Sequence, residues 1–143
     1  MSDAIDRMML LFALFAVALV GLRGYRWVRT RQRSMPPAEL LRRLEDGQDL
    51  LVLDVRNPDE FVGALGHVTG AINLPVQELS ARLTTLKAEL PALRDTTLVV
   101  ACKSGVRSSN ALWLLEWAGM KNVYVLKGGM LAWGEAGYPV AHL

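Results

Sequence analysis

Residues 97–107 read T-L-V-V-A-C-K-S-G-V-R, a strand pattern followed by a turn and the start of a helix. Its first five residues form an unbroken β-rich run, which is typical of a strand buried inside a parallel sheet. Cys102 to Gly105 are expected to form a tight turn. A helix follows through Ala118, with Gly119 as its C-cap. The sequence therefore places a cysteine at the carboxyl end of a buried strand, the edge of an open α/β sheet where ligands bind.

The flanking sequence alternates between strand and helix patterns. Short apolar runs predict strands at 50–53, 71–74 and 123–126, and the first of these is expected to be buried on both faces. Helices are predicted from Pro37 to Gly47, from 58 to about 65, over 78–90 with Pro91 as its stop, and over 130–135. This alternation predicts an α/β fold, with a parallel sheet flanked by helices on both faces.

The surroundings of Cys102 favour the thiolate over the thiol. A compact turn directs several backbone N–H groups inward, and the helix N-terminus adds about half a positive charge. Lys103 and Arg107 add two full cations within five residues, and Gly105 permits backbone angles closed to other residues. Considered singly, Cys102 fits a small buried hydrophobe, Lys103 a solvated charge and Arg107 a helix-flank ion pair. Their combination at this position favours a nucleophilic site.

The loop C-K-S-G-V-R resembles the active-site loop of rhodaneses, which reads Cys, four residues, Arg. Three other stretches are similar to motifs of that family and occur in the family's order: L-D-V-R at 53–56 with E-F at 60–61, G-H-V-T-G-A-I-N-L-P at 66–75, and L-K-G-G-M-L-A-W at 126–133 with G-Y-P at 137–139. The resemblance runs from about Pro37 to Pro139. The chain is thereby identified as similar to single-domain rhodanese-like sulfurtransferases, which implies the rhodanese-like parallel sheet.

This resemblance implies a mechanism. Cys102 would attack the outer sulfur of an anionic or persulfide donor, such as thiosulfate, and carry the sulfur as a persulfide. The substrate-binding residues would be the rest of the loop: Lys103, Ser104, Gly105, Val106 and Arg107. No second cysteine is present to resolve the persulfide, so the sulfur must pass to an external thiol or to a protein acceptor. No cofactor is implied.

Several other residues attract notice but are interpreted as structural. Asp54 and Arg56 are expected to brace the scaffold, and Glu60 is also given a structural interpretation. His67 is expected to be a hydrogen-bonded structural histidine, because a thiolate held by amides and cations needs no general base. Three tryptophans are interpreted as core or rim packing: Trp113, Trp117 and Trp133.

Composition limits the alternatives. A chain of 143 residues has room for one domain and a short appendage. Residues 1–34 hold six arginines and two aspartates, a balance of +4, whereas residues 35–143 have a balance of −2. The slightly acidic domain offers no footprint for nucleic acid. The single cysteine excludes an internal disulfide and a multi-cysteine zinc site, and with two histidines no metal site is predicted.

The apolar run Met8–Leu22 predicts a transmembrane helix. As a helix it is about 22 Å long against a hydrocarbon core of about 30 Å. Arg7 and Arg23 can extend it by snorkelling, and Tyr25 and Trp27 suit the interface. We therefore expect an uncleaved anchor and basic linker over 1–34, with the polar stretch 29–34 as linker, and a rhodanese-like domain over 35–143.

Two alternatives to an anchor remain open. A cleaved signal peptide would have a basic n-region, whereas this one has two aspartates and one arginine. A helix docked on the domain would have a polar face, which this run lacks. Five arginines follow the run, so we expect a single-pass protein of the cell inner membrane with the domain in the cytoplasm and the arginines on anionic membrane lipid.

Two rival functions share features of this sequence. Phosphatases and arsenate reductases of the Cdc25-like group share this architecture but carry five residues between Cys and Arg, which makes room for a tetrahedral phosphate. This chain has four between Cys102 and Arg107, which suits a single transferred sulfur. The second rival is a membrane-tethered module that acts as a protein-to-protein sulfur relay or adaptor, with little turnover on small donors. The loop alone does not distinguish this relay from a thiosulfate enzyme.

Overall fold

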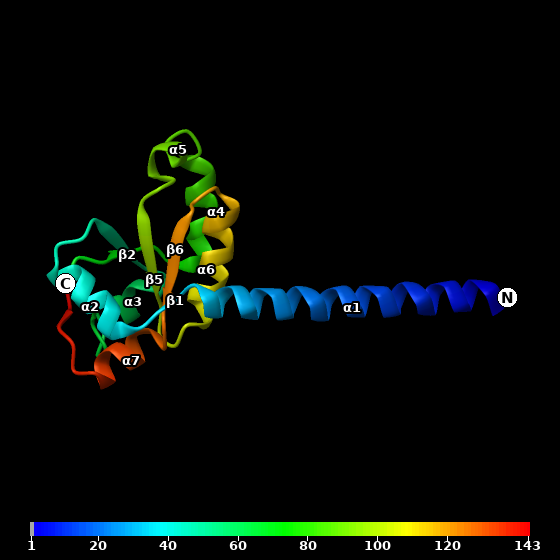
Figure 1. Ribbon diagram of the computed structural model, residues 1–143, viewed down its shortest axis with the longest axis horizontal. Helices are drawn as coiled ribbons and strands as arrows, with labels where there is room; N and C mark the ends of the chain where they lie inside the picture. The colour runs from blue at the N-terminus through cyan, green and yellow to red at the C-terminus, as the bar shows by residue number, and fades with distance from the viewer. Residues whose placement is uncertain (1) are drawn as a thin grey trace. The chain divides into compact units, whose positions relative to one another are not determined.

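The computed structural model describes residues 2–143, and the chain divides into two units, Met1–Gln32 and Arg33–Leu143. Figure 1 shows the order of the helices and strands along the chain, coloured from the N-terminus to the C-terminus. The first unit is one helix and the second is an α/β domain.

The first unit is the uninterrupted helix α1, Ser2–Gln32. Its segment Ala4–Gln32 is long and apolar enough to cross a membrane, a property that a signal sequence near an N-terminus shares. The stretch expected as a polar linker, 29–34, is helical as far as Gln32. Arginine and glutamine favour helix, and the Thr30 hydroxyl donates a hydrogen bond of 2.9 Å to the carbonyl of Arg26, so nothing in this stretch ends the helix earlier.

The domain is built on a five-stranded sheet in the order β1-β6-β5-β2-β4, and every pairing is parallel. Its strands are β1 (Ser34–Met35), β2 (Leu50–Asp54), β4 (Ile72–Asn73), β5 (Thr97–Ala101) and β6 (Asn122–Leu126). The central strand β5 has the bounds that the sequence predicts. Four of its five residues are buried, because β2 and β6 flank it and helices cover both faces.

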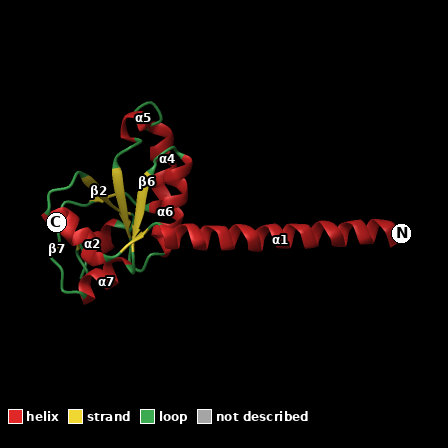
Figure 2. Cartoon of the chain, in the orientation of Figure 1, coloured by secondary structure: helices red, strands yellow, loops and turns green. Residues whose placement is uncertain are grey.

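Helices lie on both sides of the sheet, as Figure 2 shows. On one side α4 (Val76–Thr85) and α6 (Val106–Trp117) bury Leu79, Ala111, Leu112 and Leu115 against β5 and β6. On the other side α2 (Pro37–Glu45) and α7 (Gly129–Glu135) bury Leu40, Met130 and Trp133. The predicted α/β fold with a parallel sheet flanked on both faces is therefore confirmed.

Several predicted elements differ from the structure. The helix expected over 78–90 is two helices, α4 and α5 (Leu90–Leu93). Pro91 lies in the first turn of α5 instead of ending a helix, because its fixed φ suits that position and its missing N–H needs no partner there. Leu51 in β2 is 40% exposed, so this strand is not buried on both faces as expected.

Three short elements complete the domain. The helix α3 (Pro58–Phe61) ends before the predicted residue 65. Strand β3 (His67–Val68) pairs antiparallel with β7 (Val140–Ala141), a two-stranded sheet that the sequence analysis did not predict. Strands of two residues are too short to leave an alternating pattern in the sequence. Strand β1 was missed for the same reason.

Candidate functional site

Cys102 follows the last residue of β5 and is 1% exposed. Its Sγ accepts a hydrogen bond of 3.0 Å from the backbone N–H of Gly105. Gly105 has a φ of +107° and is the N-cap of α6, so the chain turns back over the sulfur within three residues. A side chain with a Cβ rarely adopts that angle, which explains why glycine stands here. The loop is thus a tight turn with at least one amide directed at the thiol.

The N-terminus of α7 holds the same loop from outside. Met130 N–H donates a hydrogen bond of 2.8 Å to the carbonyl of Cys102, and Leu131 N–H donates one of 3.1 Å to the carbonyl of Lys103. In a trans peptide the N–H points opposite to the C=O. The amides of Lys103 and Ser104 therefore point away from α7, and the carbonyls of Cys102 and Lys103 are kept out of the loop interior.

Close approach between α7 and the loop requires a glycine at 129. A Cβ on Gly129 would lie 2.5 Å from the carbonyl oxygens of both Cys102 and Lys103, and its φ of +62° also disfavours any other residue. This role of Gly129 was not predicted from the sequence. The signal that could have identified this role was the pair of glycines directly before a helix in the C-terminal motif.

The predicted substrate-binding residues share one loop but differ in exposure. Lys103 and Ser104 are exposed, Gly105 is half-buried, and Val106 is 71% exposed. Arg107, in the first turn of α6, is half-buried. The loop therefore presents Lys103, Ser104 and Val106 to solvent beside the buried sulfur.

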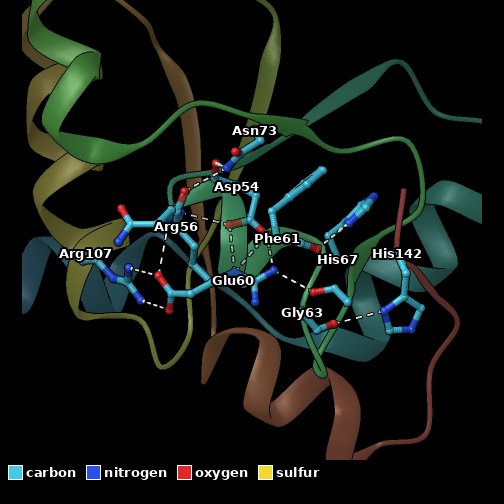
Figure 3. Close-up of polar contacts among 11 residues, drawn as sticks. Asp54, Arg56, Glu60, Phe61, Gly63, His67, Asn73, Arg107 and His142 are labelled. Atoms are coloured by element: carbon cyan, nitrogen blue, oxygen red, sulfur yellow. Dashed lines mark hydrogen bonds and ion pairs between the residues drawn. The ribbon is translucent and has the colours of Figure 1, made fainter.

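Arg107 is engaged by a carboxylate from another part of the chain. Its Nη1 donates to Glu60 Oε2 at 2.6 Å and its Nη2 donates to Glu60 Oε1 at 2.8 Å (Figure 3). The expected second full cation beside Cys102 is therefore balanced by an anion. Arg107 matches the ion-pair alternative that the sequence left open, although its partner lies in α3 and not on its own helix.

The contact between Glu60 and Arg107 strongly favours the ionised form of both side chains. The hydrogen bonds from Arg107 lower the pKa of Glu60 from its usual 4.5 to about 2, and the backbone N–H of Asn57 adds to the effect against partial desolvation. The same bonds raise the pKa of Arg107 above its ordinary value, and the nearby charges of Cys102 and Asp54 act in the same direction. Both groups are ionised at every physiological pH.

Asp54 and Arg56 form a buried ion pair (Figure 3). Arg56 is 1% exposed and Asp54 is 0% exposed, and Arg56 Nη2 donates to Asp54 Oδ2 at 2.6 Å. The same nitrogen donates to the carbonyl of Gly66 at 2.7 Å, which ties β2 to the chain before β3. Asn73 Nδ2 donates to the carbonyls of Asp54 and Arg56 at 3.0 and 2.8 Å. The predicted scaffold role of Asp54 and Arg56 is confirmed.

His67 is also structural, as predicted. Its Nδ1 lies 2.8 Å from the carbonyl oxygen of Phe61, and its ring stacks on that of Phe61 with centroids 3.5 Å apart. It is 3% exposed, so its ring is occupied by scaffold contacts.

The tryptophans divide into different environments. Trp133 is 1% exposed and its Nε1 donates to the carbonyl of Pro139 at 2.9 Å, which confirms a core role. Trp117 is 85% exposed, so its expected packing role is wrong. It follows Leu115 on α6 by two residues, which turns it away from the face that α6 buries.

A buried cysteine at the end of a parallel strand, with an amide on its sulfur and a strand-to-helix turn around it, defines an α/β protein with a nucleophile loop. The rhodanese-like domain family matches residues 36–136, and the chain belongs to that family. A sulfurtransferase of Allochromatium vinosum is 37% identical over 101 residues, which cover 71% of this chain and 87% of that protein.

Solved structures agree with this assignment. A human single-domain sulfurtransferase has 29% identity and a TM-score of 0.61, with 72% of this chain and 96% of that chain covered. Longer relatives match only in part. A tRNA uridine(34) hydroxylase of Xanthomonas oryzae is 36% identical over 110 residues. The chain spans 43% of that protein and 51% of a relative in Synechocystis.

Proposed function

We propose that this chain takes a sulfane sulfur from a small donor as a persulfide on Cys102 and passes it to a thiophilic acceptor. The observation that carries this proposal is the hydrogen bond of 3.0 Å from Gly105 N–H to Cys102 Sγ. A hydrogen-bond donor directed at the sulfur stabilises negative charge there, both on the attacking thiolate and on the terminal sulfur of the persulfide. The sulfurtransferase relatives support the same chemistry.

The transfer has two balanced steps. The Cys102 thiolate attacks the outer sulfur of the donor, a new S–S bond forms, and the S–S bond of the donor breaks. Sulfite from thiosulfate, or a thiolate from a persulfide, leaves with the electron pair. An acceptor thiolate then attacks the outer sulfur of the Cys102 persulfide, and the Cys102 thiolate is the leaving group.

Lys103 and the loop amides supply binding for the donor. The ammonium of Lys103 is exposed one residue from the nucleophile, where it can attract an anion. The amides of Lys103 and Ser104 are directed away from α7 because the carbonyls of Cys102 and Lys103, in the same two peptide units, accept hydrogen bonds from α7. Together with the Gly105 amide they form the proposed cradle for the transferred sulfur.

Intact mass measurement tests the proposal. The full chain, purified in a non-ionic detergent, is incubated with thiosulfate or with a thiol persulfide, and its mass is recorded before and after dithiothreitol. We expect a gain of one sulfur atom that dithiothreitol removes and that Cys102→Ser abolishes. No adduct from either donor would contradict the proposal, and an adduct retained in Cys102→Ser would contradict the role of this cysteine.

We also propose that α1 is an uncleaved single-pass anchor that holds the domain at the cytoplasmic side of the inner membrane. The support is its length and apolar composition, together with the arginines that follow the apolar run. Cell fractionation with a carbonate wash should leave the chain in the membrane pellet with its N-terminus intact by mass. Soluble protein, or a chain cut after the apolar run, would contradict an anchor. Protection of the domain from protease in intact spheroplasts tests the orientation.

A further inference from the structure

Glu60 and Arg107 are 47 residues apart in the sequence and meet at the edge of the sulfur site. Glu60 belongs to α3, and Arg107 belongs to the first turn of α6, five residues after Cys102. Their two hydrogen bonds, 2.6 and 2.8 Å long, form a bidentate pair. Bidentate pairing uses the planar fork that makes arginine a good partner for oxyanions. The same fork is therefore not available to a substrate without displacement of Glu60.

Glu60 is also held by hydrogen bonds at the start of its own helix, α3. Its Oε2 accepts a hydrogen bond of 3.2 Å from the backbone N–H of Asn57, and the Asn57 side chain accepts a hydrogen bond from the backbone N–H of Glu60. This capping box fixes the carboxylate at the start of α3. Side chains held from two directions lose little further entropy when they pair, so the Glu60–Arg107 contact is favoured over an exposed pair.

The Glu60–Arg107 pair changes the charge that a sulfur donor encounters at the Cys102 loop. Without Glu60 the loop would carry two cations, Lys103 and Arg107. With Glu60 ionised, Arg107 is balanced, and Lys103 is left as the cation of the loop for which the described residues 2–143 supply no ion pair. Apart from the attacking thiolate, the loop then offers one unbalanced positive charge, that of Lys103, which suits one negative charge on the donor.

We propose that Glu60 determines donor preference: by holding the guanidinium of Arg107 it selects monoanionic sulfane-sulfur donors, such as persulfides and thiosulfonates, over dianionic thiosulfate. This inference rests on the proposed function of Cys102. Glu60 is then a positioning residue that acts through Arg107.

Two small donors isolate the effect of one charge. Methanethiosulfonate differs from thiosulfate by a methyl group in place of one negatively charged oxygen, so it is a monoanion of nearly the same shape. In both cases the Cys102 thiolate forms an S–S bond to the terminal sulfur. The bond from that sulfur to the oxidised sulfur breaks, and methanesulfinate or sulfite leaves with the electron pair.

The experiment compares Glu60→Gln with Asp59→Asn in the full chain in detergent. Asp59 is exposed and precedes Glu60 in α3, so its change to Asn removes one negative charge nearby without altering the Arg107 pair. The rate constant for persulfide formation is measured by quenched intact mass with each donor. In Glu60→Gln we expect the thiosulfate to methanethiosulfonate ratio to rise roughly five- to tenfold, and in Asp59→Asn to change by less than about twofold.

A second pair of variants tests whether Arg107 transmits the effect. In an Arg107→Gln background the change Glu60→Gln should no longer raise the ratio. An unchanged or lower ratio in Glu60→Gln, or the same rise in the Arg107→Gln background, would overturn the inference while persulfide formation itself stands. No sulfur uptake from either donor by the unaltered chain would refute the proposed function and the inference together.

Discussion

The backbone N–H of Met130 donates a hydrogen bond of 2.8 Å to the carbonyl oxygen of Cys102. This bond joins the helix that follows β6 to the residue that follows β5, so the nucleophile loop is held by a second element as well as by its own strand and helix. The contact fixes the peptide between Cys102 and Lys103, and with it the direction of the Lys103 amide. The geometry at the Cys102 sulfur therefore depends on α7 as well as on the loop itself.

Gly129→Ala should disrupt this contact. The new Cβ would lie 2.5 Å from the carbonyl oxygens of Cys102 and Lys103, and alanine would have to adopt a φ of +62°. We expect the free energy of unfolding to fall by about 2–3 kcal/mol. We also expect slower persulfide formation, because the loop must shift. Urea denaturation in detergent and the intact mass assay measure these effects.

Gly134→Ala is the matched control for that change. Gly134 lies in the same helix, its φ is not positive, and a Cβ there meets nothing within 4 Å. Alanine should leave sulfur uptake unchanged and raise the free energy of unfolding by up to about 1 kcal/mol, since glycine is unfavourable inside a helix. Equal losses in both variants would show that the contact of Gly129 with the loop is unimportant.

The elements that could be predicted are those with a clear local pattern in the sequence. Strand β5 has the predicted bounds because its run of β-rich residues is unbroken. The buried Asp54–Arg56 brace was also expected from its place after a strand. In contrast, β1, β3 and β7 are two residues long and owe their existence to partners elsewhere in the chain. The local hydrophobic periodicity of a sequence does not indicate which distant segments pair.

The sequence could not predict how charges are paired at the site. Lys103 and Arg107 lie close to Cys102 along the chain, so both were counted as cations that act on the sulfur. Glu60 is distant in sequence, and only the position of α3 beside α6 brings it to Arg107. Trp117 illustrates the same limit, since its exposure depends on how α6 is rotated against the sheet.

Arg56→Met should strongly destabilise the domain. The change leaves the carboxylate of Asp54, which is 0% exposed, without its ion-pair partner. Removal of one member of a buried pair costs about 3–5 kcal/mol. The double variant Asp54→Asn with Arg56→Met should lose less than the sum of the two single variants. Additive losses in urea denaturation would contradict the coupling of these two residues.

Trp133→Ala and Trp117→Ala should differ sharply in stability. Trp133 is 1% exposed, so truncation leaves a cavity and should cost about 3–5 kcal/mol. Trp117 is 85% exposed, and the same change should alter the free energy of unfolding by about 0.5 kcal/mol or less. Thermal unfolding monitored by circular dichroism distinguishes the two. Similar midpoints for both variants would mean that α6 or α7 is packed differently.

The Glu60–Arg107 pair predicts a specific dependence of the free energy of unfolding on pH. The pKa of Glu60 falls from its usual 4.5 to about 2 in the folded domain, so the unfolded chain takes up this proton first as the pH falls. Stabilisation by the ionised carboxylate is complete above about pH 5 and is lost as the pH falls toward 2. Glu60 is 33% exposed, so after solvent screening we expect about 1 kcal/mol. The difference in free energy of unfolding between the unaltered chain and Glu60→Gln should be constant from pH 5 to 7 and shrink below pH 4. A difference that is undiminished at pH 2.5 would show that the carboxylate charge does not stabilise the pair.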